Sequence, residues 1–355
     1  MTSILDRYIG RSIVITSLMV LLVLMALAAV FSFIGELDDV GRENYTLGTA
    51  ALYILLRLPA SAYEMFAPAV LLGALLGLGT MATHSELVVM RAAGISIGRI
   101  IRSVLQAGVL LMFVVAVLGE FVAPKTEQTA QDIRLNALSK KVSVGSKSGL
   151  WLRSGERFIN VKTVMPDRTL IDLIVYRFDG QRLQSVMAAG QAKPLDGGRW
   201  QLENITINEF DGQKSGVRRE AQRIENDLVA PEALQNLSVD PEVLSARNLM
   251  QQAGYLKDNK LDSDRIQLAL WSKLTNPLAT LVMLMLAVPF VFGSQRSGGA
   301  GQKIFIGIML GIGYIMLNRL FTHMGLVYGF PPVISAVAPL LVFFLIAVVG
   351  IRRTS

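Results

Sequence analysis

The chain has 355 residues, of which 52% are hydrophobic and 17% charged, whereas soluble domains are close to a quarter charged. Its 34 Lys and Arg exceed its 27 Asp and Glu by seven, but they form no run with interleaved aromatic residues, so nucleic-acid binding is disfavoured. The absence of cysteine excludes disulfides, thiolate metal sites and cysteine nucleophiles, and it is compatible with either a reducing or an oxidising compartment.

Charged residues gather in one central segment. Residues 120–273 hold 22 Lys and Arg and 20 Asp and Glu, which leaves only 12 and 7 for the other 201 residues. Apolar stretches long enough to cross a hydrocarbon core about 30 Å thick lie on both sides of it. They cover residues 13–35, 65–83, 103–119, 275–295, 304 to about 324, and 331–351. The sequence therefore predicts six transmembrane helices, three in 1–119 and three in 274–355, around an insert at 120–273.

Basic residues in the short flanks predict the orientation, because such residues stay on the cytoplasmic side. Nine of them fall on one side of the predicted spans: Arg7, Arg11, Arg91, Arg99, Arg102, Arg296, Lys303, Arg352 and Arg353. The opposite flank after the first span carries four acids, Glu36, Asp38, Asp39 and Glu43, against one base, Arg42. Both termini are therefore predicted to be cytoplasmic, with the insert across the membrane.

The insert reads as β-structure. Runs rich in β-branched and aromatic residues at 150–153, 157–164, 170–178, 183–192 and 200–210 alternate with Ser-Gly, Pro-Asp and Asp-Gly turns. Five or more short strands at this spacing predict an all-β sandwich or jelly roll, flanked by helices.

One connector between spans carries a possible coupling element. Thr83 and Glu86 have capping-box spacing, and Gly94 is placed to end a helix, so residues 84–93 are predicted to form a short cytoplasmic helix. It is either a solvated connector or a coupling helix that an energy-supplying partner contacts. In the second interpretation, Glu86 and Arg91 reach the partner, and Leu87 and Met90 fill its groove.

The remaining motifs favour no catalytic centre. His84 and His323 are far apart and lack a ligand partner, no hydrolase triad is evident, and the glycine-rich loop at 293–303 lacks the Gly-Lys-Ser/Thr ending of a phosphate loop. No catalytic residue, metal site or cofactor is expected in this chain. Glycine pairs four residues apart, Gly73 with Gly77 and Gly307 with Gly311, predict close helix contacts, either within the chain or in a dimer.

Arg319 and His323 lie four residues apart and so share one helix face. About 23 Å into the fifth span at 1.5 Å per residue, they are predicted to lie near the outer membrane surface. They either face an anionic ligand or extend to the interface.

Several motifs together resemble the LptF/LptG permeases of the lipopolysaccharide exporter, with the closest likeness to the LptG branch. They are Leu5-Asp-Arg-Tyr-Ile-Gly10, Leu71-Leu-Gly-Ala-Leu-Leu-Gly-Leu-Gly79, Ser85-Glu-Leu-Val-Val-Met90, Gly149-Leu-Trp151 and Val327-Tyr-Gly-x-Pro-Pro332. The resemblance covers essentially the whole chain, including the three-plus-three arrangement and the β-insert.

The resemblance implies a non-catalytic permease subunit in a bacterial inner membrane, with a periplasmic jelly-roll domain. Its partners would be an LptF-like permease, an LptB ATPase dimer that binds ATP and Mg, and LptC. Lipopolysaccharide would enter from the outer leaflet between span one of one subunit and span five of the other. Glu86 falls at the position of the family's coupling-helix glutamate.

Relatives are expected to carry lysines near the outer end of span one, where this chain has Glu36, Asp38 and Asp39. Two explanations follow: phosphate binding has moved to other basic residues, or the acids hold phosphates through a divalent cation. The basic candidates are Arg319, His323, Arg57 and Arg42. The acyl-chain candidates are Met65, Phe66 and Phe321, for which helix packing is an equal alternative.

Two other functions fit parts of the pattern. One is a permease of another lipid, lipoprotein or drug exporter, whose usual four spans argue against it. The other is a non-transporting membrane anchor that presents a β-domain, which needs neither a coupling helix nor basic residues within the membrane.

Overall fold

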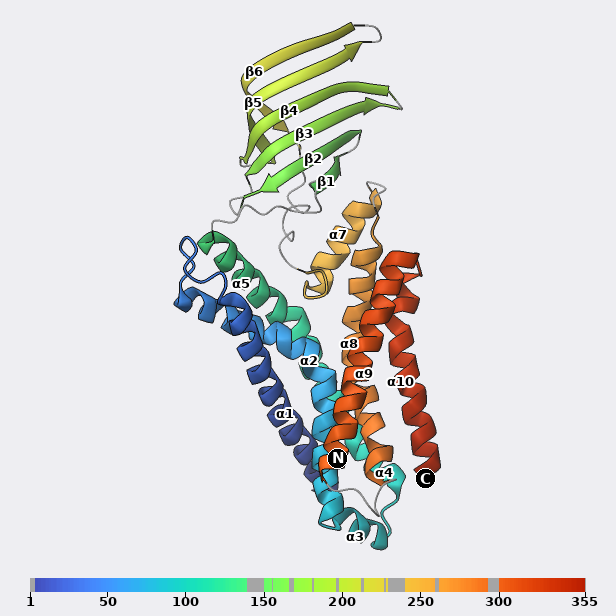
Figure 1. The fold of residues 1–355 in the computed structure, drawn as a ribbon. Coiled ribbons are helices and arrows are strands. Elements are labelled where there is room, and N and C mark those ends of the chain that lie inside the picture. Colours follow the sequence, from blue (N-terminus) through green and yellow to red (C-terminus); the bar gives the residue numbers. More distant parts are fainter. Residues whose placement is uncertain are drawn as a thin grey trace. The chain divides into compact units, whose positions relative to one another are not determined.

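The computed structural model describes residues 4–138, 150–154, 156–165, 169–180, 182–195, 198–211, 214–226, 228, 240–258, 262–292 and 300–354 (Figure 1). The chain forms two compact units. The first consists of Met1–Gly35, Ile54–Thr126 and Asp264–Ser355, and the second of Glu36–Tyr53 and Glu127–Ser263. The predicted loop at 293–303 lies largely outside the described residues.

Six helical segments in the described part of the chain are long and apolar enough to span a membrane. The helices are α1 (Ile4–Glu36), α2 (Leu47–Thr83), α3 (Glu86–Ala92), α4 (Ile97–Val117), α5 (Ala123–Ala137), α7 (Ala246–Asp258), α8 (Asp264–Phe292), α9 (Ala300–Tyr328) and α10 (Pro332–Thr354). The spans match the predicted ones in number and order but are longer at most ends. The apolar stretch marks the part that suits hydrocarbon, whereas backbone hydrogen bonding continues into the polar flanks.

The glycine pairs pack helices within this chain. A Cβ at Gly73 would lie 2.3 Å from the Cα of Ser17 in α1, and Gly77 faces Thr16, whose hydroxyl donates to the Gly73 carbonyl at 2.7 Å. Gly307 of α9 meets two leucines of α2 in the same way, Leu72 and Leu75. These pairs are therefore intramolecular contacts, and α8 packs against α4, α9 and α10 to complete the helical unit.

A short π-helix, η1 (Leu118–Val122), joins α4 to α5 without a break in the third span. The ammonium of Lys273 on α8 donates to the carbonyl of Gly119 at 2.9 Å and lies 4.8 Å from the centre of the Tyr63 ring. Gly119 has no room for a side chain, because its Cβ would lie 2.3 Å from that ring. These contacts hold α2, η1 and α8 together at the position of Gly119.

The described strands of the insert form a six-stranded antiparallel sheet in the order β1-β2-β3-β4-β5-β6. The strands are β1 (Leu150–Ser154), β2 (Arg157–Val164), β3 (Leu170–Asp179), β4 (Arg182–Pro194), β5 (Arg199–Asp211) and β6 (Lys214–Asn226). Five of them fall where the sequence predicts strands. The described strands are joined in sequence as a meander, so the crossing connections of a double-sheet jelly roll are not found among them. The all-β insert is confirmed, but its expected jelly-roll connectivity is not.

One face of the sheet carries the hydrophobic core of the second unit, which includes Ile159, Leu173, Ala189, Leu202 and Ile205. Along each strand these residues alternate with residues of the opposite face, except where the paired ladder is interrupted, as between Leu202 and Ile205. The outer strand β6 has no such alternation, since its sequence carries charges on both faces.

Candidate functional site

The connector helix α3 occupies residues 86–92, close to the predicted 84–93. Its start differs from the predicted capping box. Thr83 ends α2, where its hydroxyl donates to the Gly79 carbonyl at 2.9 Å, and Ser85 takes the N-cap position with a φ of 58°. Gly94 ends the helix as predicted, at a φ of +85°, with its N–H bonded to the Arg91 carbonyl.

Glu86 is half-buried and accepts a hydrogen bond from the hydroxyl of Tyr8 at 2.9 Å. Tyr8 lies in the first turns of α1, and nearby Asp6 accepts a hydrogen bond from Ser103 of α4 at 2.5 Å. The start of α1 is thereby bonded to α3 and to α4. Tyr8 was not foreseen in this role, because a contact across 78 residues leaves no local sequence signal.

The exposed surface of α3 differs from the predicted one. Leu87 is fully buried within this chain, so it cannot fill a partner's groove in this conformation. The apolar residues that face outward are Val88, 48% exposed, and Val89, 65% exposed. Met90 is half-buried and Arg91 is exposed, as a contact with a partner would require.

The first two candidates for an anionic site, Arg319 and His323, are both exposed on α9 and lie one helical turn apart. Phe321, between them in sequence, is half-buried. Arg57 of α2 is half-buried and already engaged in an interaction. Arg319 and His323 are thus the pair that the structure places on one open helix face.

Arg42 is part of a polar network in the second unit. Its guanidinium lies 2.6 Å from Asp39, and Arg134 of α5 bonds both Asp39 and Glu36 at 2.9 Å. The hydroxyl of Tyr45 donates to Glu36 at 2.9 Å. Burial raises the pKa of Tyr45 well above its usual range, and the bond to Glu36 raises it further, so the phenol stays protonated and donates.

This network argues against the divalent-cation alternative for the acidic flank. Arg134 neutralises Glu36 and Asp39, so these two carboxylates are already occupied by a guanidinium and do not need a divalent cation to balance their charge. No group of three or more metal-ligating side chains occurs in the described part of the chain. Arg134 was missed in the sequence because it lies 95 residues beyond Asp39, on a helix predicted only as a flank.

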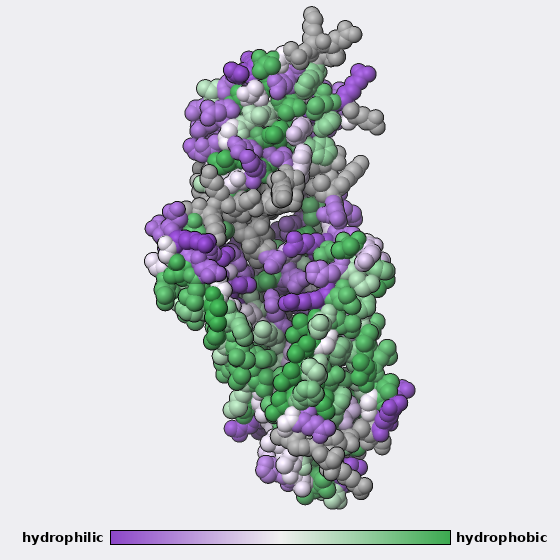
Figure 2. All heavy atoms as spheres, in the orientation of Figure 1, coloured by the Kyte–Doolittle hydropathy of each residue, from purple (hydrophilic) through white to green (hydrophobic). Residues whose placement is uncertain are grey.

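The acyl-chain candidates differ in their access. Phe66 is only 3% exposed and packs inside the helical unit, so it belongs to the helix-packing alternative. Met65 and Phe321 are half-buried. The spanning segments differ in how much of their apolar window is buried within the chain: 17% in α1 and in α9 and 28% in α10, against 72% in α2. The exposed apolar side chains of α1 and α9 include Leu22, Phe31, Phe305 and Met316. Figure 2 shows apolar side chains in a broad band over the spanning helices.

Comparison with known proteins gives consistent matches. The family described as lipopolysaccharide export system permease LptF/LptG matches residues 7–353. The LptG permease protein of the lipopolysaccharide export system of Escherichia coli K12 is 35% identical over 99% of both chains. The protein of the same name from Haemophilus influenzae is 33% identical over 97% of this chain and 96% of its own.

Proposed function

The chain belongs to the LptF/LptG family, and from this we propose that it is the LptG-type permease subunit of a lipopolysaccharide exporter in the inner membrane. The full-length match to relatives of that name carries the assignment. The structure adds two properties that a permease requires: six spanning helices and two of them, α1 and α9, with little cover from the rest of the chain.

The open faces of α1 and α9 support pairing with an LptF-like subunit. In a bilayer, helices gain stability from association mainly where small residues allow close packing. A helix face with large exposed side chains is therefore suited to contact lipid as well as a partner helix. We place lipopolysaccharide between α1 of one subunit and α9 of the other, with Met65, Phe321 and the exposed residues of α1 and α9 against its acyl chains. Each methylene taken from hydrocarbon loses about 0.8 kcal/mol unless such apolar surface replaces it.

Arg319 and His323 support an anionic group at the outer part of this surface. The guanidinium of Arg319 can bind a phosphate through two parallel hydrogen bonds. Arg42 is the weaker candidate, because Asp39 already pairs with it. Arg57 is half-buried and engaged within the chain, which also makes it a secondary candidate.

The coupling mechanism is a population shift driven by an ATPase partner. An LptB dimer binds and hydrolyses ATP with Mg. It contacts α3 of this chain at Glu86, Val88, Val89, Met90 and Arg91. Because Glu86 also bonds Tyr8, movement of α3 reaches the start of α1, which lines the lipid surface. ATP-driven closure then disfavours the lipid-occupied state. This chain itself makes and breaks no covalent bond in the proposed cycle. The β-domain would pass lipid to LptC or hold LptC in position.

The first test is affinity purification in mild detergent, with mass spectrometry of copurifying proteins and lipid. The proposal expects an LptF homologue, an LptB ATPase, LptC and bound lipopolysaccharide. Another transporter's ATPase without lipopolysaccharide would assign the chain to a different exporter. Recovery of the chain alone would favour a non-transporting anchor.

A further test addresses coupling. Glu86→Ala is expected to abolish lipopolysaccharide-stimulated ATP hydrolysis or complex assembly. His84→Ala serves as the control, because this exposed residue lies two positions away and its ring bonds the Thr80 carbonyl of the preceding helix α2. Normal export and stimulation in the Glu86 variant would contradict the coupling role.

A further inference from the structure

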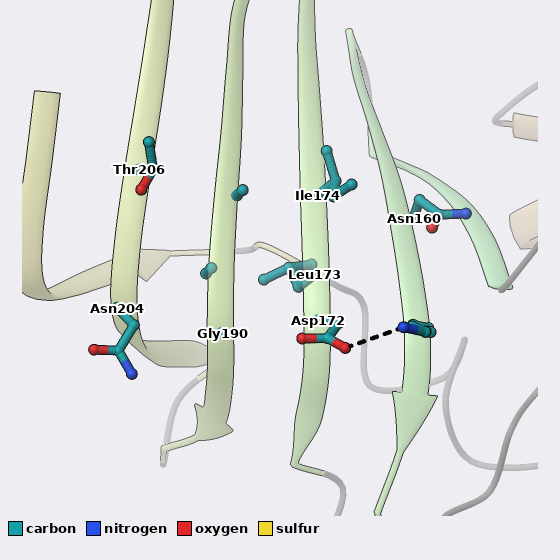
Figure 3. Close-up of a pocket in the computed structure, with 10 residues that line it drawn as sticks. Asn160, Asp172, Leu173, Ile174, Gly190, Asn204 and Thr206 are labelled. Carbon is teal, nitrogen blue, oxygen red and sulfur yellow. Dashed lines mark ion pairs between the residues drawn. The ribbon is translucent and has the colours of Figure 1, made fainter. Parts of the chain in front are cut away.

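A groove of about 460 Å³ crosses the middle of the β-sheet. Its side-chain walls come from β2, β3, β4 and β5 (Figure 3). Leu173 and Ala189 point to the hydrophobic core, so their strand neighbours Asp172 and Ala188 point to the opposite face. The groove therefore lies on the face away from the core, and the acyl-chain surfaces described above do not include it.

Small residues of β4 make the floor of the groove. Ala188 and Gly190 stand on the groove face of that strand, between larger side chains on the strands at either side. A Cβ at Gly190 would lie 3.4 Å from the Cβ of Asn204, an ordinary van der Waals contact, so a longer side chain at this position would occupy part of the groove.

Two cross-strand rows make the walls. The strand register aligns Asn160, Ile174, Ala188 and Thr206 in one row. The neighbouring row contains Lys162, Asp172, Gly190 and Asn204, where the paired ladder is interrupted. In that row, Asp172 and Asn204 have φ values of 53° and 55°. Residues with a side chain rarely adopt this left-handed backbone, and Asn and Asp tolerate it best. Both of these residues line the groove.

The polar groups of the groove suit hydroxyl groups better than a phosphate. Lys162 and Asp172 form an ion pair at 3.5 Å, and both side chains are exposed, so the only charges lining the groove balance each other. The amides of Asn160 and Asn204 and the hydroxyl of Thr206 can each donate and accept. Paired donors and acceptors on a neutral surface are what a sugar ring with adjacent hydroxyls requires.

An aromatic platform lies beside these groups. Trp151 of β1 is directly opposite Asn160 in the register, and its ring stacks on Tyr176 with centroids 5.7 Å apart. Trp151 is nevertheless 50% exposed. A half-exposed ring held by stacking can pack against the C–H face of a sugar at little entropic cost.

We propose that this groove is a saccharide-binding site, in which Asn160, Asn204 and Thr206 hydrogen-bond sugar hydroxyls and Trp151 packs against a sugar ring. The site stands independently of transport. If its sugar belongs to lipopolysaccharide, it rests on the proposed function and assigns the outer face of the sheet to the polar part of that substrate.

The test uses the full chain in lipid nanodiscs and saturation-transfer NMR, which detects weak sugar binding. Three probes are compared: lipid-free core oligosaccharide from lipopolysaccharide, a peptidoglycan disaccharide, and inorganic phosphate. Asn204→Ala and Trp151→Ala are each expected to weaken saccharide binding about tenfold, the effect of losing one well-formed contact. Gln222→Ala is the control, because Gln222 is exposed on β6 and does not line the groove.

If the wild-type chain binds one of the saccharides and both groove variants bind it more weakly, the result supports the site. The saccharide that binds identifies the source of the natural ligand. Absence of saccharide binding, equal loss in the control, or displacement by phosphate would overturn it. Thr206→Val, which keeps the side-chain shape, distinguishes lost hydrogen bonding from misfolding. Copurification of the exporter proteins is unaffected by any of these results, so a failure here is separable from a failure of the proposed function.

Discussion

At the scale of single residues, Gly73 decides how closely α1 and α2 approach. Gly73→Val is expected to destabilise the protein by roughly 1–3 kcal/mol, because the new side chain meets Ser17 backbone atoms that cannot move aside. The thermal midpoint of the purified chain in detergent measures this. Gly313→Val is the control, since nothing lies within 4 Å of the added Cβ there. Equal losses in both variants would mean that helix propensity, and not the close contact, explains the effect.

The Tyr8 hydroxyl provides a second residue-scale prediction. Tyr8→Phe removes only the hydrogen bond to Glu86, so stimulated ATP hydrolysis should fall between that of wild type and that of Glu86→Ala. Stimulation at the wild-type level in Tyr8→Phe would show that this hydrogen bond is not needed for coupling.

At the scale of elements, Arg134 connects α5 to the segment between α1 and α2. Arg134→Ala is expected to cost about 1–3 kcal/mol, because the largely buried Glu36 loses a charged partner and Asp39 keeps only its ion pair with the exposed Arg42 among those described. Hydrogen exchange should rise in residues 37–46, where Tyr45 also bonds Glu36. Arg42→Ala is the matched control, since this 62% exposed side chain makes a surface pair worth within about 1 kcal/mol. Similar exchange in both variants would contradict the connecting role of Arg134.

Elements with a strong periodic pattern could be predicted from the sequence. The six spans and five strands follow from apolar length and from alternation. The sixth strand could not be predicted, because β6 carries charges on both faces and, among the described strands, pairs with β5 alone. Hydrogen bonds to β5 hold it in place, and such bonds leave no hydrophobic signature.

The candidate site was less predictable, because its details depend on contacts between distant residues. Glu86 and Gly94 stood out by local spacing. The burial of Leu87 could not be predicted because Leu87, Val88, Val89 and Met90 are consecutive apolar residues of α3, and that of Phe66 because most of α2 is apolar. Arg134 and Tyr8 were missed because their partners lie 95 and 78 residues away.

At the scale of the whole molecule, the proposed topology predicts which positions of the chain can be labelled from the periplasmic side of the membrane. Because the chain has no cysteine, single cysteines provide unambiguous reporters. A cysteine in place of Asp179, the exposed last residue of β3, should react with a membrane-impermeant maleimide in spheroplasts. A cysteine in place of Arg353 should react only after permeabilisation. The reverse pattern would invert the orientation.

The meander order of the sheet matters for how the domain is made. On the proposed topology, more than a hundred residues between α5 and α8 cross the membrane unfolded, one end first. Each described strand pairs with the one before it, so the sheet can grow as successive strands emerge, without waiting for a distant partner. A fold built from local pairings thus suits a domain that is delivered gradually while both of its ends become fixed in a bilayer.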